Sequence, residues 1–332
     1  MKQHPPAHPK PLTFSLLRLL ADGDFHSGED MAQRLGLSRT SVHNALQAVD
    51  DFGIKLHSVR GRGYQLSHPL YWLDAGEIGA ELGEVRDVLQ IELLDHAPSS
   101  NALLMQRAAL GAASGSVLAL EWQSAGRGRL GRAWHSGLGD ALTFSLLWRF
   151  ECGLAALSGL SLAVGVAVVR ALHELGVPGA GLKWPNDVLL GRGKLAGILL
   201  EAQGDMLGPS AVVIGIGLNL TRPKQADIEI DQPVSDLAVC GIPLQDRNRV
   251  LALLLKHLVK ILREFALHGF APLRAEWESY HLFQQRAAKL LLPDGATVEG
   301  EVQGVTDEGA LRLLTSSGER IFNAGEISLR GL

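Results

Sequence analysis

Apolar residues recur at helical spacing near the start of the chain and give way to short strand-like runs before residue 67. Phe14, Leu17 and Leu20 share one face of a first predicted helix, because residues three and four positions apart lie on the same side. Ser27 and Ser38 are predicted N-caps of two further helices, since a serine hydroxyl can accept a hydrogen bond from the first turn. The pattern therefore predicts a compact helical unit that begins near residue 11.

The order of these elements favours a winged helix-turn-helix over residues 11–67, with the glycine-bounded turn of Arg60 and Arg62 as its wing. Arginines on such a turn can reach phosphates. The third predicted helix has a polar face suited to the major groove of DNA. That face carries Arg39, Thr40, His43, Asn44 and Gln47. The alternative is a small helical capping domain with an ordinary polar face.

Residues 70–280 alternate apolar runs with helical patterns, which predicts an α/β (α+β) central domain. Helices are expected over 158–175 and from about 246 to 268, the first of them buried because its leucines and valines recur every four residues. Strands are expected at 91–94, 117–122, 142–148, 188–190, 198–201 and 212–219. Residues 283–332 contain short β-runs separated by Asp- and Gly-containing turns, the pattern of a small SH3-like barrel.

The composition narrows the possible classes of protein. Hydrophobic residues make up 46% and charged residues 20% of 332 residues, which excludes a chain that is disordered throughout. The net charge of −4 excludes a polycationic body, so contact with DNA must be local. The two cysteines, Cys152 and Cys240, provide no disulfide scaffold, which favours a reducing cytoplasmic compartment.

Neither the N-terminus nor the longest apolar stretch predicts a targeting or membrane segment. Residues 1–10 are rich in Pro and His and predict a flexible arm rather than an export signal. The apolar stretch at 160–172 is shorter than the ~20 residues that a membrane span needs. We therefore expect no membrane contact.

A glycine- and arginine-rich segment, GRGRLGR at 126–132, follows the predicted strand 117–122. It contains a literal GxGxxG, but the residues after it are interrupted by glycines instead of forming a helix, which excludes a dinucleotide fingerprint. Arg127, Arg129 and Arg132 could close over an anionic ligand through charge-assisted hydrogen bonds. The alternative is a solvated basic loop.

A second cluster of chemistry-bearing residues is the sequence KWPND at 183–187. Lys183 precedes a proline bend, Asn186 and Asp187 follow it, and Lys194 comes after a predicted hairpin turn. Such cations around a pocket suit phosphate or adenylate chemistry, in which the protein positions reactants and neutralises growing charge. The sequence shows neither a Ser/His/Asp triad pattern nor metal-ligand spacing.

These motifs closely resemble those of biotin protein ligases. The resemblance covers essentially the whole chain, and the N-terminal part resembles that of bifunctional ligases that also repress biotin operons. It is carried by GRGRLGRAW at 126–134, KWPND at 183–187, KLAGIL at 194–199, GIGLN at 215–219 and GEISLR at 325–330.

The resemblance implies a two-step reaction that consumes ATP with Mg²⁺. Biotin and ATP would give biotinyl-5′-AMP and pyrophosphate, and a lysine of a biotin carboxyl carrier protein would then take the biotin. It also implies a homodimer when biotinyl-AMP is bound, and repression of biotin biosynthesis genes through operator DNA. Leu130 departs from the family pattern and removes a charge from the loop.

The resemblance also implies roles for individual residues. Lys194 is the first catalytic candidate, followed by Arg129 and Lys183. The biotin site would consist of Ser99, Ser100, Asn101, Gln123, Arg127, Gly128, Arg129, Lys194, Gly197 and Gly215. The ATP or adenylate site would consist of Arg127, Arg132, Trp134, Lys183, Asn186, Asp187 and Asn219. No fixed metal site is expected, and Mg²⁺ would lie near Asp187.

Two alternative functions remain open from the sequence. A lipoate or octanoate ligase would share the fold but would need a pocket for an alkyl chain. A ligand-responsive repressor without catalysis would not need to retain Lys183, Lys194, Arg127 and Arg129. For the serines, a purely structural role is also open, because Ser99 and Ser100 could simply cap a helix.

Overall fold

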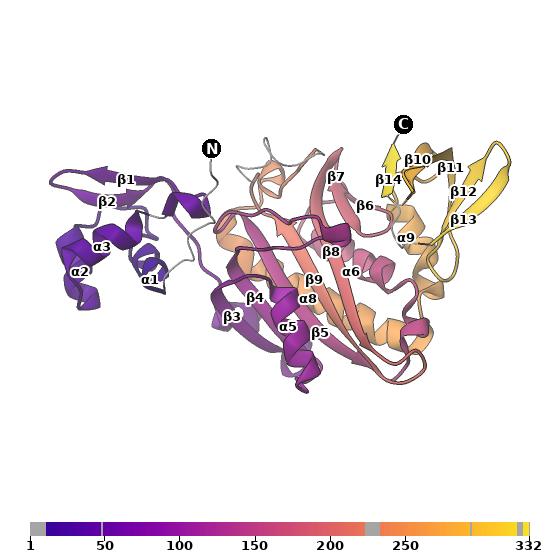
Figure 1. Cartoon of the computed structure of the whole chain (residues 1–332), viewed down its shortest axis with the longest axis horizontal. Coiled ribbons are helices and arrows are strands. Elements are labelled where there is room, and N and C mark those ends of the chain that lie inside the picture. The colour runs from indigo at the N-terminus through magenta and orange to yellow at the C-terminus, as the bar shows by residue number, and fades with distance from the viewer. Residues whose placement is uncertain (1–10, 48, 223–232, 293, 324–327, 332) are drawn as a thin grey trace.

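The computed structural model describes residues 11–47, 49–222, 233–292, 294–323 and 328–331. The predicted arm at 1–10 lies outside these residues. Figure 1 shows three parts in a row, with the N-terminal helices and hairpin on the left, a large sheet in the middle and a small sheet on the right. Within the described residues these sheets have two, seven and five strands.

The N-terminal part has the predicted helix-turn-helix and wing. The caps are as predicted, because Asp30 N donates to Ser27 Oγ at 2.9 Å and Ser41 N donates to Ser38 Oγ at 3.1 Å. Gly36 ends the second helix with a φ of +66°, a conformation that suits glycine. The elements are α1 (Pro11–Leu19), α2 (Gly28–Leu35), α3 (Arg39–Leu46), β1 (Leu56–Val59) and β2 (Gly63–Leu66).

The large sheet is mixed, with its strands in the order β3-β4-β5-β9-β8-β7-β6. β3 and β4 are parallel, and the other neighbours are antiparallel. The predicted hairpin turn is present, since Leu190 pairs with Gly193. The strands are β3 (Gln90–Ala97), β4 (Ser116–Gln123), β5 (Ala141–Phe150), β6 (Ala180–Lys183), β7 (Asp187–Leu190), β8 (Gly193–Gly204) and β9 (Ser210–Asn219). The ranges expected for these strands omit only β6, which has four residues and ends at Lys183.

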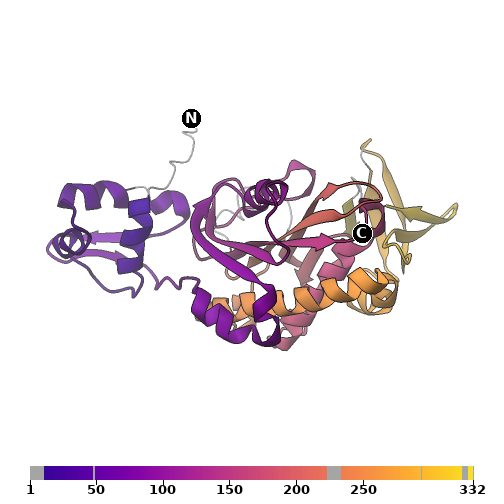
Figure 2. The same cartoon turned by 90° about the horizontal axis from the view of Figure 1, so that it is seen from below.

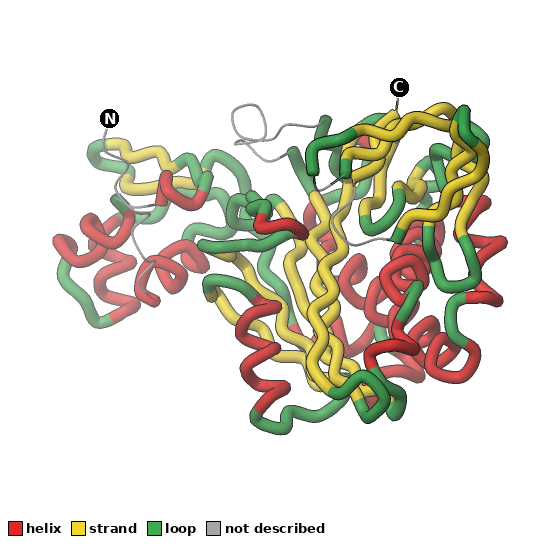
Figure 3. Tube along the Cα trace, turned by 45° about the vertical axis from the view of Figure 1, so that its right-hand side comes forward, coloured by secondary structure: helices red, strands yellow, loops and turns green. Residues whose placement is uncertain are grey.

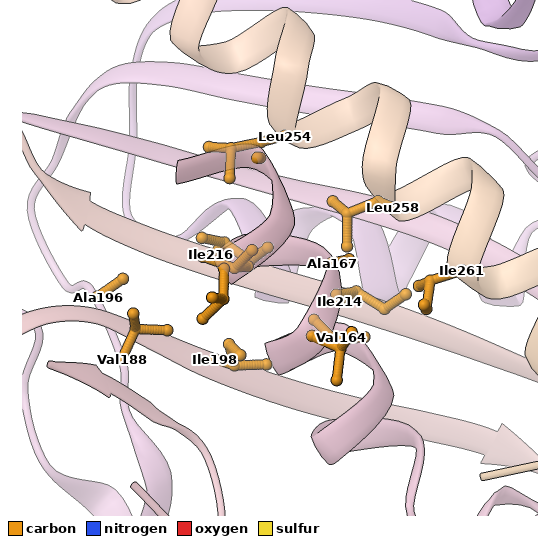
Figure 4. Packing of buried hydrophobic residues seen from close by; sticks show 14 of the residues in the cluster. Val164, Ala167, Val188, Ala196, Ile198, Ile214, Ile216, Leu254, Leu258 and Ile261 are labelled. Atoms are coloured by element: carbon orange, nitrogen blue, oxygen red, sulfur yellow. The ribbon is translucent and has the colours of Figure 1, made fainter. Parts of the chain in front are cut away.

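Both faces of this sheet are covered by helices. Val117 and Ala119 of β4 belong to one apolar cluster and Leu118 and Leu120 to another, because alternate residues of a strand point to opposite faces. Figure 4 shows the first cluster, with Val164 of α6 and Leu258 of α8 packed toward Ile214. Helix α5 packs with the second cluster. The helices are α4 (Ala75–Glu81), α5 (Ser100–Ala109), α6 (Leu160–Glu174), α8 (Arg247–His268) and α9 (Arg274–Tyr280).

The C-terminal part is an antiparallel sheet in the order β13-β12-β11-β10-β14, as the SH3-like pattern predicts. Its buried Ala288 and Leu290 join the main apolar cluster, so it packs directly on the central part. The strands are β10 (Ala287–Leu291), β11 (Thr297–Val305), β12 (Leu311–Thr315), β13 (Gly318–Phe322) and β14 (Ser328–Gly331). Part of the predicted GEISLR motif lies outside the described residues. The fold-class prediction is confirmed.

Short 3₁₀ helices complete the described elements, and Figure 3 shows how loops connect them. They are Val49–Phe52, Gly83–Val88, Arg129–Gly131, Leu154–Leu157, Ala238–Cys240, Leu244–Asp246 and Ala271–Leu273. No helix in the described part of the chain is both long enough and apolar enough to cross a membrane.

The winged helix contacts the central sheet through an aromatic pair. The ring of Phe52 meets Trp122 of β4 edge-on, with centroids 4.9 Å apart. Arg18 of α1 also forms an ion pair with Asp95 of β3 at 2.6 Å. Figure 2 shows the N-terminal part beside the central domain. The N-terminal winged helix is therefore packed against β4, the strand that leads to Gln123.

The linker after the wing is held by buried polar groups. Arg247 is 1% exposed, and its Nη1 donates to Tyr71 O at 2.6 Å and to Glu121 Oε2 at 2.7 Å. The other oxygen of Glu121 accepts from Leu73 N at 2.6 Å. These bonds satisfy Arg247 Nη1 and both carboxylate oxygens of Glu121, whereas Arg247 Nε and Nη2 have no hydrogen-bond partner among the described residues.

Candidate functional site

A pocket with an empty volume of about 470 Å³ opens between the α5 N-terminus, the segment 126–134 and strands β5, β8 and β9. All ten residues predicted for biotin line it. Of the residues predicted for ATP, Arg127, Trp134 and Asn186 line it. Its lining residues are Ser99, Ser100, Asn101, Gln123, Arg127, Gly128, Arg129, Trp134, Thr143, Phe144, Asn186, Lys194, Gly197, Ile198, Leu199, Gly215, Ile216 and Gly217.

One end of the pocket is polar and uncharged. Ser100 donates to Gln123 Oε1 from its backbone nitrogen at 2.8 Å and from its hydroxyl at 3.1 Å. Ser145 Oγ, fully buried on β5, lies 2.8 Å from Ser100 Oγ and 2.5 Å from Asn101 Oδ1. Ser145 was not among the residues predicted from the sequence. A hydroxyl inside the apolar run 142–148 could have indicated it, because a buried hydroxyl needs a polar partner. Ser99 also caps α5 by accepting from Ala102 N, so its structural role is present too.

Glycines form the floor of the pocket. A Cβ at Gly215 would lie 2.1 Å from Asn101 Oδ1, and one at Gly217 would lie 2.4 Å from the Trp134 ring. Gly197 is the cross-strand partner of Gly217. The indole of Trp134 therefore lies directly against this floor, where only glycine leaves room.

The other end of the pocket is cationic. Lys194 Nζ lies 2.6 Å from Asp187 Oδ1, and Lys183 Nζ lies 3.8 Å from Asp187 Oδ2. Arg129 Nη1 donates to Asn186 Oδ1 at 3.2 Å. Burial lowers the pKa of Arg129, but a guanidinium stays charged at neutral pH. Three cations around one carboxylate favour an anionic ligand.

The remaining residues predicted for ATP lie behind or outside the pocket. Asn219 donates from Nδ2 to Lys194 O at 3.2 Å and to Ser235 O at 3.0 Å, so it holds the backbone of Lys194. Asp187 lies beside the lining residue Lys194, and Lys183 in turn contacts Asp187. Arg132 is exposed. The residues predicted for ATP therefore fall into three groups: some line the pocket, some contact its lining residues directly or through Asp187, and Arg132 is exposed outside it.

The segment 126–134 forms a small hairpin of its own. Gly128 N donates to Arg132 O at 2.7 Å, and Trp134 N donates to Gly126 O at 2.9 Å. Arg127 Nη2 lies 3.0 Å and 3.1 Å from the two carboxylate oxygens of Glu201. Glu201 on β8 was also missed by the sequence reasoning, because it follows the motif KLAGIL and was treated only as the end of a strand.

The described residues include no group of three or more His, Cys, Asp or Glu side chains that could hold a metal ion. The carboxylate of Asp187 is paired with two lysines.

The predicted DNA-binding side chains are all exposed on α3 and the wing. His43 links the two, with Nδ1 at 3.1 Å from Tyr64 OH and Nε2 at 3.0 Å from Gln47 Nε2. The guanidinium of Arg62 lies 3.9 Å from the centre of the Phe25 ring. The His43–Tyr64 contact therefore joins α3 to the β1–β2 hairpin.

The chain matches three protein families along its length. The Biotin/lipoate A/B protein ligase family matches residues 98–219, an HTH domain matches 13–65 and the Biotin protein ligase C terminal domain matches 287–330. Among solved structures, a biotin protein ligase from Aquifex aeolicus in complex with biotin and ATP superimposes with a TM-score of 0.63. It is 30% identical, and the match covers 73% of this chain and 99% of that one.

Full-length relatives extend the similarity to the whole chain. The bifunctional ligase/repressor BirA of Salmonella typhimurium is 38% identical over 96% of this chain and 97% of its own length. The bifunctional ligase/repressor BirA of Bacillus subtilis is 32% identical over 93% of this chain and 95% of its own. The chain therefore belongs to the bifunctional ligase/repressor family of biotin protein ligases.

Proposed function

We propose that this protein activates biotin with ATP and attaches it to a lysine of a biotin carboxyl carrier protein. The observation that carries the proposal is the two-ended pocket, polar and uncharged beside α5 and cationic beside β7. Biotin has a matching polarity, with a neutral ureido ring at one end and a carboxylate at the other. Lys194 lies at the cationic end, where the carboxylate would meet ATP.

The neutral end would hold the ureido ring. Ser145 orients Ser100 and Asn101, and Ser100 in turn orients Gln123. Such preorganisation of donors and acceptors lowers the entropic cost of binding. Gly215 leaves room for the Asn101 side chain, and Gly197 leaves room for Lys194 and Trp134. Apolar Phe144 and Ile216 also line the pocket and would contact the carbon skeleton.

The cationic end would carry out adenylation. A carboxylate oxygen of biotin attacks the α-phosphorus of MgATP, a P–O bond to pyrophosphate breaks, and biotinyl-5′-AMP forms. Lys194 and Arg129 would neutralise the negative charge at the reacting phosphorus, the kind of electrostatic stabilisation that dominates phosphoryl chemistry. Lys183 would face the departing pyrophosphate. Arg132 at the rim and Trp134 on the floor would border the nucleotide.

Transfer would follow at the same carbonyl group. The neutral ε-amine of a carrier-protein lysine attacks the mixed anhydride, an amide bond forms, the bond to AMP breaks, and the amine releases a proton. The exposed mouth of the pocket permits the approach of such a lysine. Lys194 would again offset the charge on the departing phosphate.

The second proposed activity is repression of biotin biosynthesis genes. Biotinyl-AMP would favour a homodimer, and two winged helices would then meet a two-fold operator. The exposed polar surface of α3 and the wing supports DNA binding. Both Cys152 and Cys240 are free thiols, which supports a cytoplasmic location.

Pyrophosphate release by the purified protein tests the enzymatic proposal. MgATP is supplied with biotin or with lipoate, and mass spectrometry identifies the bound product. We expect release with biotin alone and a biotinyl-AMP adduct. Release with lipoate alone would establish a lipoate ligase, and no release with either acid would leave a sensor without chemistry.

A further inference from the structure

The hairpin 126–134 is attached to two separate points on the wall of the pocket. Arg129 contacts Asn186, whose backbone and amide bond to Ile198 of β8 at 3.0 Å and 2.8 Å. Arg127 contacts Glu201, three residues further along β8. At the rise of an extended strand these points lie roughly 10 Å apart. The hairpin thus spans the pocket from its cationic end to its uncharged end.

Glu201 joins the hairpin to the proposed biotin site. One of its oxygens, Oε2, accepts from Arg127 Nη2 at 3.1 Å and from Asn101 Nδ2 at 2.9 Å. Asn101 in turn contacts Ser145 and lines the pocket. The Glu201 side chain is 28% exposed and that of Arg127 is 46% exposed. A conformational change in the hairpin that moves Arg127 would therefore also shift Asn101, because both side chains bind the carboxylate of Glu201.

We infer that Glu201 is a positioning residue that holds the hairpin 126–134 closed over the uncharged end of the pocket. The inference rests on the proposed function, because the ligand retained there would be biotinyl-5′-AMP. The hairpin's own hydrogen bonds keep its shape, and the Trp134 ring packs its base against Gly197 and Gly217. The polar attachments are the Arg127–Glu201 ion pair at the uncharged end and the Arg129–Asn186 bond at the cationic end.

This arrangement gives Glu201 a function that differs from catalysis. Its carboxylate contacts no reacting atom at the cationic end, so its loss should leave the chemical steps largely intact. The closed hairpin shields biotinyl-5′-AMP from solvent, and opening it would let the reactive anhydride leave before the carrier lysine arrives. Glu201 would therefore govern how long the intermediate stays bound.

Glu201→Gln tests this role, because the amide keeps the size of the side chain and an acceptor for Asn101 but removes the charge that Arg127 needs. Labelled biotinyl-5′-AMP is formed on the enzyme and its dissociation is followed in excess unlabelled biotin and MgATP. Trypsin cleavage after Arg127, Arg129 and Arg132 is measured on the protein without ligand. We expect dissociation and cleavage to become about five- to tenfold faster, the effect of losing one charge-assisted contact.

Glu92→Gln is the matched control, since it removes the charge from an ion pair with Arg107 on the partly exposed surface outside the pocket. The double variant Arg127→Glu with Glu201→Arg restores an ion pair of opposite polarity and, without ligand, should recover part of the protection from trypsin after Arg129 and Arg132. Unchanged dissociation and cleavage in Glu201→Gln would overturn the inference, as would a swapped variant cleaved at these two sites as fast as Glu201→Gln. If the wild-type protein forms no biotinyl-5′-AMP, the proposed function fails. Trypsin cleavage would still test whether Glu201 holds the hairpin 126–134 closed.

Discussion

The ammonium group of Lys194 lies 2.6 Å from the carboxylate of Asp187, across the hairpin that joins β7 to β8. Both side chains are less than one-fifth exposed. Asp187 ends the motif KWPND and begins β7, and Lys194 ends the turn GRGK and lies on β8. Because β7 and β8 pair antiparallel, the two residues meet at one site. The pair therefore holds a cation at the pocket wall before any anion binds.

Replacing Lys194 with Ala should slow adenylation by about 10²–10³-fold, the effect typical of removing one preorganised group that stabilises transition-state charge. Pyrophosphate release with biotin and MgATP measures it. Lys260→Ala is the control, because Lys260 is 52% exposed and pairs with Glu84 away from the pocket. A wild-type rate in Lys194→Ala would remove this lysine from the chemistry.

Gly215→Ala should weaken biotin binding at least tenfold. The added methyl group would overlap Asn101 Oδ1 and displace the amide from Ser145. Titration calorimetry with biotin measures the loss. Gly179→Ala serves as the control, because its Cβ would meet only Leu190 at an ordinary 3.4 Å. Equal affinity in the two variants would contradict the proposed place of the ureido ring.

His281 should make the folded protein less stable as the pH falls from 6.5 to 4. Burial lowers its pKa from 6.5 to about 4, so the unfolded chain takes up a proton in this range before the folded chain does. The shift corresponds to roughly 3 kcal/mol of unfolding free energy lost below pH 4. Urea unfolding at pH 7 and pH 4.5 measures it. In His281→Phe the free energy of unfolding should differ less between pH 7 and pH 4.5 than in the wild type. If this difference stays unchanged, other titrating groups cause the pH dependence.

Arg247→Met should destabilise the protein by about 3–5 kcal/mol, because Glu121 would remain as a buried charge without its partner. Glu121 is only 4% exposed. Denaturant unfolding measures the change, and Arg249→Met, at the exposed neighbouring position, should stay close to wild type. A small effect at Arg247 would show that the linker is not held by this pair.

Arg60→Ala and Arg39→Ala should each weaken binding to duplex DNA and leave biotin activation unchanged. If each arginine neutralises one phosphate, its loss reduces the slope of log K against log salt by about 0.9. Fluorescence anisotropy at several salt concentrations measures this with a duplex of arbitrary sequence. Arg263→Ala, which removes the same charge from the exposed face of α8, is the control. Identical slopes in all three variants would refute the winged-helix interface.

Local pattern was enough to predict most of the fold. Serine caps, a glycine C-cap and four-residue apolar spacing act over a single helical turn, so Ser27, Ser38, Gly36 and the helix around Val164 could be assigned without tertiary contacts. The hairpin at Gly193 was equally local. Strand β6 was missed because Ala180 to Lys183 has little intrinsic strand preference and is held by pairing with β7.

By itself the sequence determined the order of three parts and the residue types of a biotin-activating pocket, since motifs such as KWPND and GRGRLGRAW are contiguous. The tertiary structure decided what those residues face. Ser145 and Glu201 became visible as site residues only when β5 and β8 placed them beside Asn101. Arg127 lines the pocket, but its contact with Glu201 could not be predicted, because hydrogen-bond partners 74 residues apart are set by sheet register and not by local spacing.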